Sequence, residues 1–168
     1  MTAAKENEET VALSQLADGR QSPAAAEIAR GAVRLLARHG LASVAELPLP
    51  NGRRADLVAL TPAGDLWILE IKSCLEDFRA DQKWPDYRGF CDRLYFAVKP
   101  DFPLDALPAE AGLVLADRYG GEIVREAPLH RLAAARRKTM TLRFARAGAL
   151  RLSLVLDPPL SQVVGAEG

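Results

Sequence analysis

The sequence predicts an α/β protein in which helices flank a mixed β-sheet. The order of expected elements, α-β-β-β-α-β-β-β-α, is typical of that class. Short apolar runs bounded by turn residues indicate the strands, and longer segments with helical spacing indicate the helices. The chain has 168 residues, 49% of them hydrophobic, which suffices for one full core but not comfortably for two domains.

The predicted domain covers residues 22–157 and begins with a helix over 22–38. Ser22 and Pro23 are residue types that favour an N-cap and a first helical position, and Gly40 is suited to end the helix. The remaining elements follow in order: strands at 43–49, 54–60 and 66–72, a helical segment at 76–90 that Pro85 should kink or divide, strands at 94–98, 113–116 and 123–125, and a long helix from about 129 to 154.

Two turns connect the first three strands, and each predicts a register. Asn51-Gly52 is the strongest signal for a two-residue hairpin turn. Such a turn would make Glu46, on the preceding strand, face away from Asp56, so Glu46 is not expected in a shared site. Pro62-Ala63-Gly64 suits a three-residue loop, because proline fixes φ and glycine supplies the left-handed residue.

Asp56, Glu70 and Lys72 stand out because charged side chains rarely occupy apolar strands. If Thr61 faces Asp65 across the second loop, Asp56 lies directly opposite Glu70. Lys72 points to the same face as Glu70, since alternate strand residues share a face. The alternative is that all three are ordinary polar residues on the wet face of a sheet.

This set of side chains suits metal-dependent hydrolysis of phosphodiesters. Asp56 and Glu70 would bind Mg²⁺ or Mn²⁺, with the Ile71 carbonyl as a further ligand. Hard oxygen ligands of this kind argue against zinc. Lys72 would clamp the phosphate or orient the attacking water. Glu27 is a further candidate ligand, although it also fits an ordinary solvated stripe on the first helix.

Several basic and aromatic residues are candidates for contact with nucleic acid. Residues 127–156 contain seven basic and no acidic residues, whereas the rest of the chain has 15 basic and 22 acidic residues. Such a segment indicates contact with a DNA backbone, although a basic helical face is often merely solvated. Trp84 and Tyr87 would either stack on bases or anchor the core. The candidates are Arg53, Arg54, Lys83, Trp84, Tyr87, Arg136, Arg137, Lys138, Arg143 and Arg146.

The two ends of the chain and its cysteines carry weaker signals. Residues 1–21 are polar and acidic without periodicity and are expected to form a disordered tail, and residues 158–168 a flexible one. A signal peptide and a membrane-spanning apolar run are both absent from the sequence, so a cytoplasmic protein is expected. Cys74 and Cys91 are too far apart for a C-x-x-C motif, which argues against a structural zinc site.

Six segments of the chain resemble the MmcB-like DNA repair proteins of bacteria, a family placed with the PD-(D/E)XK nuclease superfamily. The resemblance extends from about residue 22 to 157. Its segments are RRADL (53–57), WILEIKS (67–73), DFRAD (77–81), KWPDY (83–87), CDRLYFAV (91–98) and ARRK (135–138). KWPDY and CDRLYFAV are much more specific than the superfamily motif. Ala55 stands where the superfamily name has proline, a position at which relatives often lack it.

The resemblance implies a restriction-endonuclease-like fold with a four-stranded mixed sheet at its core. It also implies a metal site at Asp56 and Glu70, Lys72 as the catalytic lysine, and a role in DNA damage at the nucleoid beside translesion or mutagenesis proteins. One function that fits is a Mg²⁺- or Mn²⁺-dependent DNA endonuclease in repair. The alternative is a non-catalytic module that binds DNA or a repair partner. A hydrolase of small phosphoesters fits the basic last helix less well.

Overall fold

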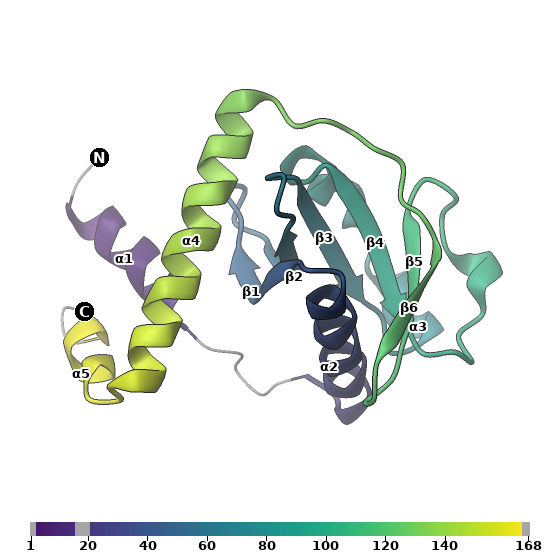
Figure 1. Ribbon diagram of the computed structural model, residues 1–168, viewed down its shortest axis with the longest axis horizontal. Coiled ribbons are helices and arrows are strands. Elements are labelled where there is room, and N and C mark those ends of the chain that lie inside the picture. Colours follow the sequence, from purple (N-terminus) through teal and green to yellow (C-terminus); the bar gives the residue numbers. More distant parts are fainter. Residues whose placement is uncertain (1–2, 16–20, 166–168) are drawn as a thin grey trace.

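The computed structural model describes residues 3–15 and 21–165, and at its centre is one six-stranded sheet (Figure 1). The strands are β1 (Ala42–Pro48), β2 (Arg54–Leu60), β3 (Leu66–Ile71), β4 (Arg93–Val98), β5 (Gly112–Ala116) and β6 (Gly121–Arg125). They lie in the sheet in chain order. β3, β4 and β5 are mutually parallel and the other neighbours are antiparallel. The predicted mixed sheet of an α/β protein is therefore confirmed.

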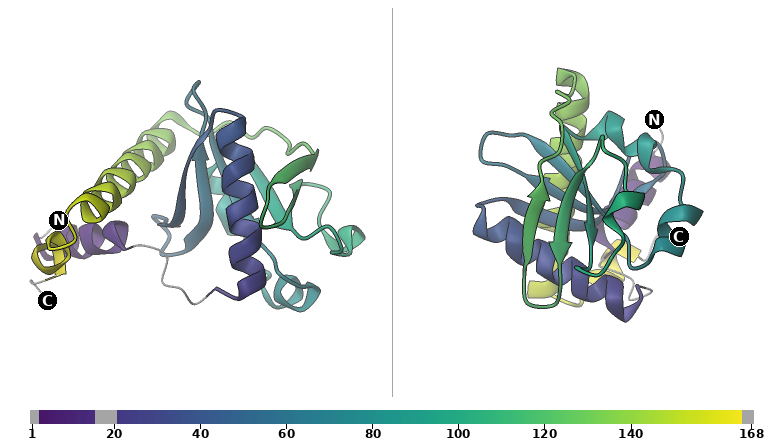
Figure 2. Two further views of the ribbon diagram at one scale, coloured as in Figure 1. Left: turned by 60° about the horizontal axis from the view of Figure 1, so that its bottom comes forward. Right: turned by 90° about the vertical axis from the view of Figure 1, so that its right-hand side faces the viewer.

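Helices cover both faces of this sheet. The helices are α1 (Ala3–Ser14), α2 (Pro23–Arg38), α3 (Leu75–Ala80), α4 (Ala134–Leu156) and α5 (Leu160–Gly165), with 3₁₀ segments η1 (Trp84–Phe90) and η2 (Leu104–Ala106). α2 crosses one face, and the long helix α4 lies on the other side with α1 and α5 beside it (Figures 1 and 2). The predicted long C-terminal helix is thus present.

The core is divided by the sheet into two halves. Leu57 and Leu69 pack against α2 on one face. Val58 and Ile68 pack against α4 and η1 on the other. Because successive strand residues point to opposite faces, the even-numbered residues of β2 and β3 point toward α4 and η1. This parity decides which charged strand residues share a face.

The N-cap and the C-terminal glycine of α2 are as the sequence predicts. The Ser22 hydroxyl accepts a hydrogen bond from the Ala25 backbone N–H at 3.1 Å, and Pro23 is the first helical residue. Gly40, just past the helix, has φ of +74°, the left-handed conformation that a helix C-terminus favours. These contacts fix both ends of the helix that covers the first face.

The β2–β3 hairpin has the predicted loop, but the β1–β2 hairpin does not. Thr61 N donates to the Asp65 carbonyl at 3.0 Å, and Gly64 has φ of +88°. In the other hairpin, the Leu49 N–H donates to the Arg53 carbonyl at 2.7 Å. The loop is therefore Pro50-Asn51-Gly52, one residue longer than predicted, and it reverses the expected facing of β1 relative to β2.

Two predicted helices have different bounds in the structure. The segment at 76–90 consists of α3 and η1, the division that Pro85 suggests. α4 begins at Ala134 rather than near residue 129. Asp92 explains the later start, because its Oδ1 accepts a hydrogen bond from Leu132 N at 2.9 Å and holds the preceding segment outside the helix.

Helices lie in the parts of both expected tails that the structure describes. α1 spans Ala3–Ser14, and Leu13 is fully buried in the core beside α4. The Arg151 Nε donates to the Leu13 carbonyl at 3.1 Å, which ties α1 to α4. α5 spans Leu160–Gly165 in the other expected tail. Of the helices described, none is both long and apolar enough to cross a membrane.

Candidate active site

Asp56 and Glu70 meet where the β2–β3 ladder stops. The paired residues run from Leu60–Leu66 to Leu57–Leu69, so Asp56 and Glu70 are the next opposed positions and the predicted register is confirmed. The Asp56 N–H donates to Glu70 Oε1 at 3.2 Å, and the Ile71 N–H donates to Asp56 Oδ2 at 2.8 Å. Each carboxylate thus accepts a backbone N–H at the point where the regular pairing ends.

Burial gives this carboxylate pair an unusual affinity for positive charge. The Glu70 side chain is 2% exposed, and burial together with the negative charge of Asp56 raises its pKa well above the ordinary value. Burial also raises the pKa of Asp56, although the hydrogen bond from Ile71 opposes that effect. Both carboxylates are stabilised by a proton or by a cation beside them.

Lys72 lies on the same face, but its ammonium is held by a residue that sequence reasoning did not select. Lys72 is 6% exposed, and its Nζ contacts Asp81 Oδ2 at 2.6 Å. Burial alone would raise the pKa of Asp81, but the hydrogen bond and charge of Lys72 lower it below the ordinary value. A buried lysine requires an anionic partner, and that requirement is the signal that could have led to Asp81.

Tyr87 closes the site from η1. Its side chain is buried in the core, and its hydroxyl donates to the Arg54 carbonyl at 3.3 Å. Burial and the charges of Glu70 and Asp56 raise the pKa of Tyr87, so the phenol stays protonated. Of the two roles weighed for Tyr87, the structure supports the core anchor rather than a base-stacking surface.

Glu46 is a third carboxylate at this site. The pairs Ala45–Leu57 and Leu47–Ala55 place Glu46 opposite Asp56, and its negative charge contributes to the raised pKa of Asp56. Glu46 is 5% exposed and has φ of +48°, a conformation that non-glycine residues rarely adopt. Sequence reasoning missed it because the β1–β2 loop has three residues instead of two.

Glu27 is not brought to this site. It belongs to α2, which packs on the opposite face of the sheet from Asp56 and Glu70. Its carboxylate contacts Lys99 Nζ at 3.0 Å. The hydrogen bond and charge of Lys99 lower the pKa of Glu27.

The donor set at the site fits a hard divalent cation with an incomplete protein shell. In the part of the chain that the structure describes, no three His, Cys, Asp or Glu side chains are grouped to hold a metal ion by themselves. Asp56, Glu70 and the Ile71 carbonyl would offer oxygen ligands. Mg²⁺ typically takes one or two carboxylates from a protein and completes its shell with water and substrate oxygens.

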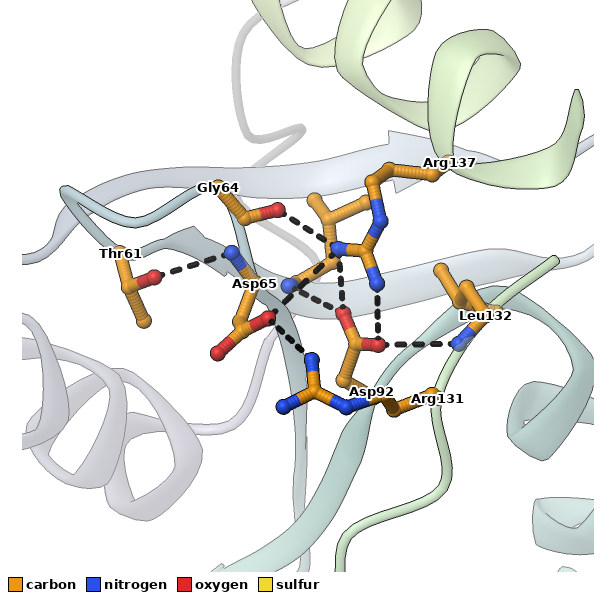
Figure 3. A network of polar contacts seen from close by, with 8 residues as sticks. Thr61, Gly64, Asp65, Asp92, Arg131, Leu132 and Arg137 are labelled. Atoms are coloured by element: carbon orange, nitrogen blue, oxygen red, sulfur yellow. Dashed lines mark hydrogen bonds and ion pairs between the residues drawn. The ribbon is translucent and has the colours of Figure 1, made fainter. Parts of the chain in front are cut away.

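Arg137 has a structural role, which differs from its predicted role in binding nucleic acid. Its guanidinium contacts both carboxylate oxygens of Asp92, at 2.6 and 2.9 Å, and donates to the Gly64 carbonyl at 2.7 Å (Figure 3). Asp92 is fully buried and also accepts hydrogen bonds from the backbone N–H groups of Leu66 and Leu132. This network joins the start of β3, the start of β4 and the segment before α4.

The other predicted nucleic-acid residues divide into paired and exposed groups. Glu9 of α1 contacts Arg143 at 3.4 Å and Arg146 at 3.9 Å, so these two arginines are not unopposed as the sequence suggests. Lys83 and Lys138 are exposed. The remaining contacts are Arg53 with Asp86 at 2.6 Å, Arg54 with Glu46 at 3.5 Å, and Arg136 with the Gly89 carbonyl at 3.0 Å.

Fold and site together define an α/β protein whose mixed sheet carries buried carboxylates and a lysine on one face, an arrangement consistent with the PD-(D/E)XK superfamily. The chain matches the family described as DNA repair protein MmcB-like over residues 12–159. It belongs to the MmcB-like family. A solved structure, the SPO1766 protein of unknown function from Silicibacter pomeroyi, is 45% identical, with a TM-score of 0.79 over 83% of this chain and 95% of that one. Among the curated proteins, none matches.

Proposed function

We propose that this protein is a divalent-metal-dependent DNA endonuclease of bacterial DNA repair. The observation that carries the proposal is the opposed pair of half-buried Asp56 and buried Glu70, both with raised pKa values, beside the buried Lys72. Two carboxylates held close together in a poorly solvated place cost stability, and the one lysine beside them is also paired with Asp81, so their retention on one face favours a catalytic use. Family membership supplies the DNA repair context.

The proposed roles follow from the position of each group. Asp56, Glu70 and the Ile71 carbonyl would hold Mg²⁺ or Mn²⁺, which when bound lowers the pKa of water and offsets charge on the phosphate. Lys72 would donate a charge-assisted hydrogen bond to a phosphate oxygen. Asp81 holds the lysine ammonium in place, and Tyr87, whose hydroxyl donates to the Arg54 carbonyl, would help to shield the carboxylates from η1.

The test of this proposal is cleavage of labelled single-stranded, duplex, nicked and branched DNA with Mn²⁺, Mg²⁺ or chelator. Asp56→Asn, Glu70→Gln and Lys72→Ala are each expected to lower the cleavage rate by at least about a hundredfold. Asp105→Asn, which removes an exposed carboxylate from η2, is the matched control and should cleave at the wild-type rate. A folded Asp56→Asn protein that still cuts at the wild-type rate would refute the catalytic proposal.

One observation favours a second candidate, a non-catalytic module that binds DNA or a repair partner. Lys72 is already paired with Asp81 at 2.6 Å, and the two carboxylates already accept backbone N–H groups. Calorimetry separates the two candidates. Heat of Mn²⁺ binding that disappears in Asp56→Asn supports the enzyme, whereas DNA binding without any metal binding supports the module.

A further inference from the structure

A pocket of about 830 Å³ lies beside η1, separate from the carboxylate site. Trp84, Arg88 and Gly89 of η1 form one wall, and Glu110, Pro128 and His130 come from the segments before β5 and α4. Its volume lies in the range of pockets that bind small organic groups. Neither the proposed metal site nor the core explains why this space is open.

Arg88 has hydrogen-bonding capacity that the fold leaves unused. Its Nη2 donates to the Glu110 carbonyl. Its Nη1 is buried and has no hydrogen-bond partner among the described residues. Unsatisfied buried donors are rare because they forgo a hydrogen bond that water would provide. A ligand acceptor in the pocket, such as a carbonyl oxygen or a ring nitrogen, would supply the missing partner after a small movement of the side chain.

Trp84 adds a flat aromatic surface to the same wall. Its ring meets Phe96 edge-on, with centroids 5.8 Å apart and planes inclined by 72°, so the orientation of the indole is fixed by the core. The Arg88 guanidinium carbon lies 6.0 Å from the Trp84 ring centroid. Indole and guanidinium groups are the surfaces on which proteins stack unpaired nucleobases.

The pocket and the carboxylate site share η1 as a common wall. The Tyr87 hydroxyl donates to the Arg54 carbonyl, two residues before Asp56, at 3.3 Å, whereas its chain neighbour Arg88 lines the pocket. A DNA strand with a phosphate at the carboxylates would therefore have a neighbouring nucleotide close to the pocket. Exposed Lys83 precedes Trp84 and is available to the backbone of such a strand.

We propose that this pocket binds an unpaired nucleobase of a DNA strand, stacked on Trp84 and hydrogen-bonded by Arg88. This inference rests on the proposed function, because the proposed function places a phosphate of the DNA strand at Asp56 and Glu70. It identifies the substrate class as DNA with unpaired bases, such as single-stranded, gapped or flapped DNA, in preference to blunt duplex. Because Arg88 offers donors, bases that present acceptors, above all guanine, should bind best.

Binding in chelator tests the pocket independently of cleavage. Fluorescence anisotropy would measure the affinity of the full chain for a single-stranded oligonucleotide and for a blunt duplex of the same sequence. Arg88→Gln is expected to weaken single-strand binding about tenfold and duplex binding less than twofold. Arg30→Gln, which removes an arginine from the exposed side of α2, is the matched control for charge and should leave both affinities unchanged.

A second variant keeps the test valid if Arg88→Gln unfolds. Trp84→Phe retains a smaller stacking surface, so it should retain more single-strand affinity than Trp84→Leu. Equal losses for single strand and duplex, or no loss in any pocket variant, would overturn the proposal. A thermal shift with dGMP alone that Arg88→Gln abolishes, without loss of single-strand binding, would assign the pocket to a free nucleotide and equally overturn it. If the wild-type protein cleaved none of the DNA substrates, the nuclease proposal would be refuted. Binding of unpaired bases to the pocket could still be measured.

Discussion

Glu70 is the residue whose environment departs most from what a folded protein normally tolerates. It is 2% exposed, and Asp56 opposes it across the end of the β2–β3 ladder. Lys72 reduces the repulsion between the two carboxylates, but its ammonium is also shared with Asp81. This arrangement therefore lowers the stability of the fold. A bound cation would reduce the repulsion between the two carboxylates.

Removing the charge of Glu70 should stabilise the metal-free protein. Its pKa is raised in the folded state, so the stability it contributes is complete below the ordinary value of 4.5 and is lost as pH rises through the folded pKa. In chelator, Glu70→Gln is expected to be more stable than wild type at pH 8, by about 1.4 kcal/mol for each unit of pKa difference, and equal to it near pH 4. Urea unfolding at both pH values measures this.

The control for that experiment is an exposed glutamate of β6. Glu122→Gln removes one carboxylate from the surface and should leave the pH dependence of the free energy of unfolding as in wild type. If Glu70→Gln and wild type lost stability in parallel between pH 4 and pH 8, the assigned charge state of Glu70 would be wrong.

Among the secondary-structure elements, α4 depends on one buried carboxylate for its position. Burial would raise the pKa of Asp92, but the hydrogen bonds from Arg137, Leu66 and Leu132 outweigh burial and lower it. The stability that Asp92 contributes is therefore present above pH 3.8, its ordinary pKa, and is lost as pH falls through the lower folded value.

Asp92→Asn should destabilise the fold by about 3 kcal/mol at neutral pH, because it leaves Arg137 without its anionic partner. Chemical denaturation measures the loss, with Asp101→Asn, an exposed carboxylate after β4, as the control. A change below about 0.5 kcal/mol would show that the network in Figure 3 does not hold α4 to the sheet.

Helix α1 is also part of the folded unit. Leu13 is fully buried between the sheet and α4, so Leu13→Ala should lower the free energy of unfolding by about 2–5 kcal/mol. Val163→Ala truncates a side chain of α5 that is 71% exposed and should change stability by less than about 0.5 kcal/mol. Equal stabilities of the two variants would mean that α1 does not pack on the domain.

Local sequence signals predicted most helices and strands and the register between β2 and β3. They did not predict contacts between segments that are distant in the sequence. The loop after Thr61 holds its register through residues within four positions, so Asp56 and Glu70 could be paired correctly. The facing of Glu46 could not be predicted in the same way, because it depends on whether the β1–β2 loop has two or three residues. The α1 helix has weak periodicity of its own and is held by Arg151, 138 positions away from Leu13, a contact that only the folded chain makes.

Across the whole molecule, positive charge is less available to a partner than its clustering in the sequence suggests. The formal net charge is zero. Several arginines of α4 face inward or toward α1: Arg137 contacts Asp92, Arg143 and Arg146 contact Glu9, and Arg151 donates to backbone carbonyls of β1. Electrostatic attraction to DNA would therefore depend less on these arginines of α4 than on exposed cations such as Lys83 and Lys138.

Lys138 is such a cation, and its contribution can be measured through salt. It is exposed on α4. Each phosphate contact contributes about −0.9 to the slope of log affinity against log salt concentration for duplex DNA. Lys138→Gln should therefore make that slope shallower by about 0.9, while Arg30→Gln on the opposite face of the sheet leaves it unchanged. Equal slopes for wild type, Lys138→Gln and Arg30→Gln would exclude Lys138 from the DNA-binding surface.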